Sequence, residues 1–326
     1  INSLASGRRI PNDDGIDIFN CKNIHISDCD IQTGDDCIAI FAGEKLTVSN
    51  STLSSRSSGI RVGYVGGDIR DCVYKNLVIH SNRGISLFVR GEDSIENILF
   101  SDIVIRSHLV TGHWWGQAEP IHLSVAPWDR NAESRGSISN VRFSNVQAEG
   151  DAGVVVQGDE TNPIRDLSFE NVRLKLTDGP LQSSYGGNFD LRAAMRPEQG
   201  VFKHDIPAMY CRHAEGLRIN GLQVAWSETV PEFFSHAMQL EDSRDIVLDG
   251  SEGHQAQDSG SAIFLNRVEG ISVRNSVAAK GTDTFLSARE FDDARLFVGN
   301  DLSDAHRATS PDDLGFTRGE NRLPQR

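Results

Sequence analysis

The sequence predicts an all-β fold, a single-stranded right-handed parallel β-helix that forms one domain over residues 1–326. Short alternating apolar segments recur along the chain, and the first of them begin at equal steps, at positions 15, 37 and 59. No long apolar stripe has the helical period of 3.6 residues, so helices contribute little. A β-sandwich or a propeller also uses many short strands. A propeller blade needs roughly 40 residues, however, whereas a step of about 22 residues suits one coil of a β-helix.

The first series of segments is expected to form one face of the solenoid. Because side chains alternate along a strand, residues of one parity should fill the core and the intervening ones should point outward. The members of this series are GIDIF from 15, CIAIF from 37, GIRVG from 59, GISLF from 84, PIHLS from 120, GVVVQ from 153, AMQLE from 237 and AIFLN from 262.

A second series completes each coil, and its Asn, Asp and Ser residues are expected at the turns. It includes NIHISDCDI from 23, KLTVSNSTL from 45, NILFSDIVI from 97, NVRFSNVQA from 140 and DLSFENVRL from 166. The coils cover about residues 12–300, and a C-terminal tail follows at 301–326. Because strands begin by residue 15, we expect that N-terminal coils or a cap are missing from this chain, since an open solenoid end leaves strand edges unpaired.

Two segments, 107–119 and 178–208, interrupt the repeat and are predicted to be insertions between coils. Long loops on a solenoid often build its binding face. Trp114 and Trp115 on the first insertion are placed either to stack on sugar rings or to pin the insertion against the solenoid, and Glu119 follows them. The second insertion is expected either to wall a groove or to pack against the side of the solenoid.

Because the coils stack, residues that are one repeat step apart in the sequence should lie next to each other on neighbouring coils. One step separates Asp13 from Asp35, and the same step separates Asp14 from Asp36, so each pair should lie about 4.8 Å apart along the solenoid axis. Four carboxyl groups at one strand mouth cannot all ionise at low cost, so their pKa values should separate into an acid and a base. This cluster is the strongest candidate catalytic site in the sequence.

An outward-facing column is predicted to run beside the acidic cluster, formed by Asp17, Ala39, Arg61, Ser86 and His122. A groove with acids at one end and Arg61 and His122 further along would suit a sugar polymer. Simpler interpretations exist for each group. Aspartates before strands are common turn residues, stacked aspartates are also candidate calcium ligands, Arg61 can simply neutralise them, and His122 can be an ordinary hydrogen-bonded histidine.

Composition limits the function classes. The net charge of −14 leaves no broad basic surface for nucleic acid or anionic membranes, and no apolar run approaches the roughly 20 residues of a membrane span. The five cysteines form no CxxC pair, so a zinc site is not expected, and they are interpreted as small buried apolar residues. No metal or organic cofactor is predicted, and the oligomeric state is left open.

At the acidic residues the sequence resembles family 28 of the glycoside hydrolases, the polygalacturonase-like enzymes of the pectin-lyase-like β-helix superfamily. Their hallmark is N-T-D-G, then D-D about one coil later, then G-H-G and R-I-K on the following coils. Here NDDG at 12–15 and GDDCIAI at 34–40 match the first two motifs. Ser58 stands in place of the motif histidine, Ser86 and Phe88 replace the two basic residues, and Arg90 follows. The resemblance covers roughly residues 10–106 and marks a divergent member.

The resemblance implies an inverting hydrolase of α-linked pectic-type poly- or oligosaccharide, secreted or periplasmic because of that substrate. It implies that Asp35 is the general acid and that Asp14 and Asp36 activate the attacking water, in line with the acid–base spacing that inverting glycosidases need. The substrate-binding candidates are Asp13, Arg61, Arg90, Trp114, Trp115, Glu119 and His122. Two alternatives remain: a β-helix polysaccharide lyase, and a non-catalytic glycan-binding module in which the aspartates form turns or bind metal.

Overall fold

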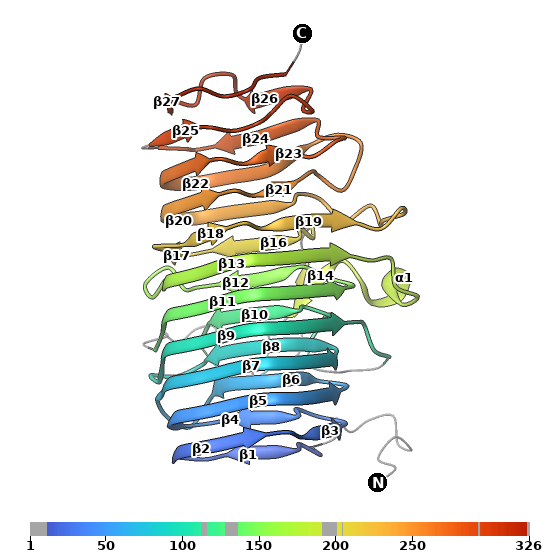
Figure 1. Ribbon diagram of the computed structural model, residues 1–326, viewed down its shortest axis with the longest axis vertical. Coiled ribbons are helices and arrows are strands. Elements are labelled where there is room, and N and C mark those ends of the chain that lie inside the picture. Colours follow the sequence, from blue (N-terminus) through green and yellow to red (C-terminus); the bar gives the residue numbers. More distant parts are fainter. Residues whose placement is uncertain are drawn as a thin grey trace.

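The computed structural model describes residues 12–111, 116–127, 136–190, 201–203, 205–292 and 294–324. Its strands stack in parallel as successive coils of a solenoid, with the first coil at the bottom and the last at the top of Figure 1. The predicted parallel β-helix is therefore confirmed. The sheet that carries the acidic cluster, called here the front sheet, contains β1 (Ile16–Ile18), β4 (Ile38–Ile40), β6 (Ser58–Tyr64), β8 (Arg83–Val89), β10 (Ile121–Val125), β12 (Val154–Gln157), β16 (Met209–Arg212), β24 (Thr284–Arg289), β26 (Arg307–Ser310) and the first halves of β20 (Met238–Asp249) and β22 (Ser261–Arg274).

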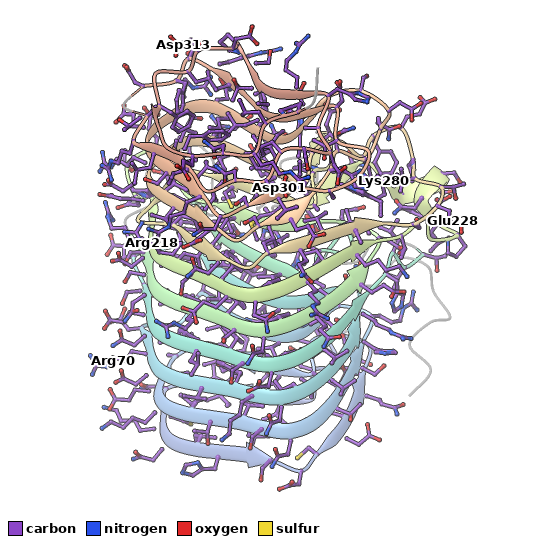
Figure 2. All side chains as sticks on the ribbon, turned by 45° about the horizontal axis from the view of Figure 1, so that its top comes forward. Arg70, Arg218, Glu228, Lys280, Asp301 and Asp313 are labelled. Atoms are coloured by element: carbon purple, nitrogen blue, oxygen red, sulfur yellow. The ribbon has the colours of Figure 1, made fainter. Side chains whose placement is uncertain are left out.

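The remaining sides of each coil come from longer strands that bend at a corner and from shorter ones. These strands are β2 (Cys21–Ser27), β3 (Asp30–Thr33), β5 (Gly43–Ser55), β7 (Ile69–Ser81), β9 (Ser94–Ser107), β11 (Ser137–Gly150), β13 (Ile164–Leu176), β17 (Ala214–Glu215), β18 (Arg218–Asn220), β19 (Gln223–Trp226), β21 (Glu252–Gly253), β23 (Val277–Ala278), β25 (Leu296–Val298) and β27 (Thr317–Arg318). Charged side chains such as Arg70 and Arg218 project away from the coils (Figure 2).

The core is a continuous column of apolar side chains inside the coils. Ile38, Ile60, Ile85 and Ile121 are paired from strand to strand and are fully buried. Aromatic rings stack in the same way on the neighbouring side: Tyr74, Phe100, Phe143 and Phe169 follow one another at centroid distances of 4.6, 4.8 and 5.2 Å. Equivalent residues thus pack against each other along the axis, so each coil covers the apolar surface of the next.

The corners are built by Asn and Asp in the left-handed backbone conformation, which these residues tolerate better than most. Asn145 has φ of 54° and Asn171 has φ of 52°. Their amides also join neighbouring coils, because Asn171 donates to Asn145 at 2.8 Å and Asn145 donates to Asp102 at 3.0 Å. The turn residues predicted from the sequence therefore form hydrogen-bonded ladders along the solenoid.

The two predicted insertions also occur, with small changes at their edges. The first lies between the end of β9 at Ser107 and the start of β10 at Ile121, so Ser107 belongs to the strand. The second follows β13 and holds the short helix α1 (Gln182–Tyr185) and an antiparallel pair, β14 (Asn188–Asp190) and β15 (Val201–Lys203). No helix of the described residues is long and apolar enough to span a membrane. All five cysteines are free thiols, and Cys37, Cys72 and Cys211 are buried.

Candidate active site

The two Asp pairs lie on adjacent coils, as the repeat step predicts. Ile16 pairs with Ile38, and the Gly15 amide donates to the Asp36 carbonyl at 2.9 Å, which brings Asp14 level with Asp36. A Cβ at Gly15 would lie 2.5 Å from the Cys37 carbonyl oxygen, so only glycine permits this close approach. Glycine after the first acidic pair thus brings the carboxyl groups of the two coils together.

Asp36 accepts three hydrogen bonds. Its Oδ1 accepts from the Ser57 hydroxyl and from the Ser58 backbone amide, each at 3.0 Å, and its Oδ2 accepts a hydrogen bond from Arg61 Nε. The Arg61 Nη2 also lies 3.9 Å from Asp14 Oδ2. A hydrogen bond from a guanidinium to a carboxyl oxygen is stronger than one between neutral groups. Asp36 is only 4% exposed, so its orientation is fixed by these partners.

Asp35, the neighbour of Asp36 in sequence, has a raised pKa. Burial, followed by the charges of Asp36 and Asp14, raises the pKa of Asp35 to about 7. Burial and the Asp36 charge raise the pKa of Asp14 to about 6. The backbone at Asp35 is fixed, since its carbonyl accepts from the hydroxyls of Thr33 and Ser55. The site therefore contains two carboxyl groups with raised pKa values beside Asp36, which is bonded to Arg61.

Asp13, the remaining member of the predicted cluster, contacts the loop before Asp35. Its Oδ2 accepts from the Gly34 amide at 3.1 Å. Gly34 has no room for a side chain on that side, because a Cβ would meet both Asp13 carboxyl oxygens at 2.6 Å. Asp13 thus shapes the turn that presents Asp35 and Asp36.

An aromatic surface beside the acids was not predicted. Phe19 and Phe41 stack at a centroid distance of 4.0 Å, and Phe19 is 59% exposed. The Arg61 guanidinium carbon lies 4.3 Å from the Phe41 ring centroid and 5.6 Å from that of Tyr64. The sequence does indicate this aromatic stack. GIDIF and CIAIF both end in Phe, and the two Phe residues are separated by the same step as the aspartates.

Arg61 forms ion pairs with both Asp14 and Asp36. The described ranges contain no group of three or more His, Cys, Asp or Glu side chains arranged as metal ligands. The column of Asp17, Ala39, Arg61, Ser86 and His122 has the predicted strand register.

The column differs from the prediction in its exposure. Ser86, His122 and Glu119 are fully buried and Arg90 is 3% exposed, so none of these side chains lines an open groove in this structure. Burial and the neighbouring Arg83 and Arg90 hold the pKa of His122 well below its usual range. The sequence pattern indicated the outward direction of these side chains but did not show that later segments cover them.

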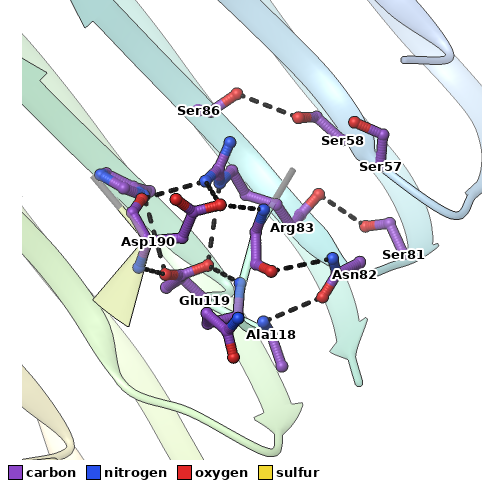
Figure 3. A network of polar contacts seen from close by, with 12 residues as sticks. Ser57, Ser58, Ser81, Asn82, Arg83, Ser86, Ala118, Glu119 and Asp190 are labelled. Atoms are coloured by element: carbon purple, nitrogen blue, oxygen red, sulfur yellow. Dashed lines mark hydrogen bonds and ion pairs between the residues drawn. The ribbon is translucent and has the colours of Figure 1, made fainter. Parts of the chain in front are cut away.

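Glu119 belongs to a buried network with Arg83, Asn82 and Asp190, called here the wall, that joins the start of β8, the first insertion and β14 (Figure 3). Glu119 accepts from the backbone amides of Gln117 and Asp190, each at 2.7 Å. Arg83 Nη2 donates to the Asp190 carbonyl at 3.1 Å and lies 3.3 Å from its carboxylate, and Asn82 bonds the insertion at Gly116 and Ala118. Glu119 is thus a residue that fixes loops.

The remaining predicted residues are Arg90 and the two tryptophans. Arg90 donates to the Ser124 carbonyl at 3.1 Å and to its hydroxyl at 2.8 Å, and its guanidinium lies over the Phe88 ring. Trp114 and Trp115 lie outside the described residues. The structure therefore brings Asp13, Asp14, Asp35, Asp36 and Arg61 together, and it places Arg90, Glu119 and His122 around the wall.

Comparison with known proteins agrees with the motifs. The sequence profile of glycosyl hydrolases family 28 matches residues 1–185. Polygalacturonase QRT2 of Arabidopsis thaliana is 28% identical over 179 residues, which is 50% of this chain and 39% of the relative. A polygalacturonase of Cryptomeria japonica is 24% identical over 57% of this chain and 37% of the relative, and endopolygalacturonase I of Aspergillus niger is 24% identical over 52% and 40%.

The chain spans about two fifths of the length of these curated relatives. Among solved structures, the A-module of the mannuronan C-5 epimerase AlgE6 of Azotobacter vinelandii matches with 9% identity and a TM-score of 0.34, over 90% of this chain and 91% of that one. The fold described above is established by the strand register of this chain alone. Since the family profile covers more than half of the residues, the chain belongs to glycosyl hydrolases family 28.

Proposed function

We propose that this chain hydrolyses an α-linked pectic-type poly- or oligosaccharide with inversion, using Asp35 as general acid and Asp14 and Asp36 to activate water. The observation that supports it most is the difference in surroundings between neighbouring carboxyl groups. Asp35 has a pKa raised to about 7, while Asp36 accepts hydrogen bonds from Arg61, Ser57 and Ser58. A carboxyl group that keeps its proton, next to one that is bonded to a guanidinium, offers the acid and the base that glycoside hydrolysis needs.

The proton balance follows from the geometry. Asp35 donates its proton to the glycosidic oxygen as that bond breaks, and water attacks the anomeric carbon from the opposite side. Asp14 and Asp36, level on adjacent strands, hold that water and take its proton, while Arg61 keeps Asp36 in place. The exposed ring of Phe19 on Phe41 offers an apolar surface against which a sugar ring can stack. After release, Asp35 regains a proton from solvent, and the base loses to solvent the proton that it took from water.

The substrate proposal rests on the relatives, which are named polygalacturonases. Galacturonan is the first candidate, and rhamnogalacturonan or a neutral side structure is the second, because Ser58, Ser86 and Phe88 stand where the family motifs carry ionisable residues. Ser58, Ser86 and Phe88 are also buried, and Arg61, the cation beside the acids, is 9% exposed and already bonded to Asp36 and to the Gly63 carbonyl. We place the enzyme outside the cytoplasm, secreted or periplasmic, with this polymer.

We also propose that the enzyme acts on chain ends. The wall covers the front sheet immediately beyond Arg61, since Ser86 and His122 are fully buried beneath it. A polymer lying across Asp35 would meet the Arg83–Glu119–Asp190 network within about two strand spacings, roughly 10 Å. Products from a long polymer should therefore be of one short length from the first minutes, which gel filtration or mass spectrometry of a time course would measure. A broad early ladder of lengths would contradict chain-end action.

The test of the function is reducing-sugar release from polygalacturonan, rhamnogalacturonan and galactan by the wild type, Asp35→Asn and Asp304→Asn. Asp304 is an exposed aspartate near the C-terminal end of the chain, so its substitution makes the same chemical change away from the acids. We expect release from one polymer, retained in Asp304→Asn and lowered by about 10³-fold in Asp35→Asn. Equal rates in all three proteins would contradict the assignment. Products that absorb near-ultraviolet light would show a lyase instead.

A further inference from the structure

The front sheet opens to solvent a second time, far from the acids. Positions equivalent to Arg61 are fully buried on the next four strands, at Ser86, His122, Val155 and Tyr210. Phe189 of the second insertion stacks on Tyr210 at 5.6 Å, so β14 covers this stretch. The column becomes partly exposed again at Phe264 and Ser287, which belong to β22 and β24. The wall therefore separates two openings on one face.

A pocket of about 440 Å³ occupies this second opening, a volume within the range of small-ligand sites. It lies roughly six strand spacings, or about 29 Å, from Arg61. Its lining combines an aromatic ring with groups that donate or accept hydrogen bonds, and it is formed by Asp205, His236, Gln239, Gly260, Ser261, Phe264, Asp283, Thr284, Ser287, Arg289 and Ser310.

The aromatic part of the pocket is a pair of stacked rings with an arginine beside it. The His236 and Phe264 rings are nearly parallel, at 5.1 Å and 15°, and the Arg289 guanidinium carbon lies 5.6 Å from the Phe264 centroid. His236 Nδ1 lies 2.6 Å from the Ser261 carbonyl oxygen. A carbonyl only accepts, so Nδ1 carries the proton and Nε2 is the acceptor of the neutral ring. The orientation of the histidine is therefore set before any ligand binds.

The polar part of the pocket matches hydroxyl groups. Ser261 Oγ and Ser287 Oγ are 2.6 Å apart, and both are on the front sheet. Two aspartates, Asp205 and Asp283, and one arginine, Arg289, line the pocket, and the whole chain carries a net charge of −14. An anionic sugar would be repelled by this balance, whereas a neutral sugar can use the carboxylates as hydrogen-bond acceptors.

We propose that this pocket is a second, non-catalytic glycan site that binds neutral sugar residues. It has no route along the sheet to the acids because the wall lies between them, so it binds a separate stretch of glycan. The site would hold the enzyme on material that carries neutral chains while the acids act on another segment. The proposal concerns binding alone, and it stands or falls independently of the hydrolysis proposed above.

Isothermal titration calorimetry with a neutral galactan tetrasaccharide tests this site in the Asp35→Asn background, where the ligand stays intact. We expect binding that is weakened about tenfold or more by Phe264→Ala, and weakened severalfold by Arg289→Gln, a change of an exposed residue that leaves the core untouched. The matched control is Arg218→Gln on β18, which should not alter binding. Phe19→Ala, which removes the exposed ring beside the acids, reports any part of the binding that occurs there.

Each alternative result would overturn the proposal. No heat of binding with the parent protein at millimolar tetrasaccharide would do so. Loss of binding in Phe19→Ala with no change in Phe264→Ala or Arg289→Gln would place the ligand at the acids instead. Tighter binding of tetragalacturonate than of the neutral tetrasaccharide, lost in Arg289→Gln, would show an anionic ligand. Separately, undiminished hydrolysis by Asp35→Asn would remove the catalytic assignment, whereas a loss of binding confined to Phe264→Ala and Arg289→Gln would still support this site.

Discussion

At the scale of single residues, Asp35 and Asp36 are neighbours in sequence that differ in their partners. Asp36 has Arg61, a hydroxyl and a backbone amide, whereas Asp35 has burial and two nearby negative charges. The sequence predicted that the carboxyl groups would share one place and differ in pKa. It did not show which partners would make the difference, because Ser57 and Ser58 reach Asp36 from the next coil of the solenoid.

The dependence of kcat/KM on pH should be bell-shaped, with its two limbs set by Asp14 and Asp35. Asp35 must be protonated, so kcat/KM should fall as pH rises above about 7, and Asp14 must be ionised, so it should fall below about 6. Because the Asp14 charge raises the pKa of Asp35, the residual activity of Asp14→Asn should show its upper limb at a lower pH. An upper limb that stays in place in Asp14→Asn would contradict this coupling.

The same raised pKa affects stability. The folded protein keeps the Asp35 proton up to about pH 7, whereas the unfolded chain releases it near pH 4, so folding stability should fall as pH rises between these values. The Asp35→Asn variant has no carboxyl group to ionise at this position, so it should not lose folding stability in this way. At pH 8 the variant should be more stable than the wild type by on the order of 2 kcal/mol, with a smaller difference at pH 4. Urea unfolding at both pH values measures it, and a variant less stable at pH 8 would contradict it.

At the scale of elements, the corners are where the sequence was most informative. Asn and Asp that recur from coil to coil predicted the turns, since few other residues accept a positive φ. Strand register followed from the same recurrence, because a slip of one residue would expose the isoleucines that fill the core. The contacts made by the insertions could not be predicted. Arg83 reaches Asp190 only because of the conformation of the second insertion, which the sequence repeat does not encode.

The ladder at Asn145 offers a test at this scale. Asn145→Gly keeps the backbone conformation and loses hydrogen bonds to Asp102 and Asn171, at a cost of about 1 kcal/mol. Asn145→Ala also forces a Cβ residue into a left-handed conformation, so the total should be about 2 kcal/mol. Urea midpoints compare them, with the exposed strand variant Gln147→Ala as control. Equal losses for Gly and Ala would show that backbone strain plays no part.

At the scale of the whole molecule, the net charge of −14 opposes an anionic polymer. If galacturonan is the substrate, its KM should fall severalfold as NaCl rises from about 0.01 M to about 0.2 M, because salt screens the repulsion. Hydrolysis of a neutral polymer should not respond. Initial rates on both polymers at the two salt concentrations would measure this salt dependence of KM. A KM for galacturonan that rises with salt would show that local attraction at Arg61 outweighs the repulsion by the net charge.

The wall and the acidic cluster should form at different stages of folding. Neighbouring coils are held by contacts between residues one repeat apart, so the carboxyl groups at 14, 35 and 36 and their arginine come together as soon as the first coils stack. The Arg83–Asp190 contact spans 107 residues and waits for the second insertion. Contacts that close long loops form late. A folding chain would therefore hold its acids first beside an open groove, and it would gain its barrier only when more than half of its residues had joined the solenoid.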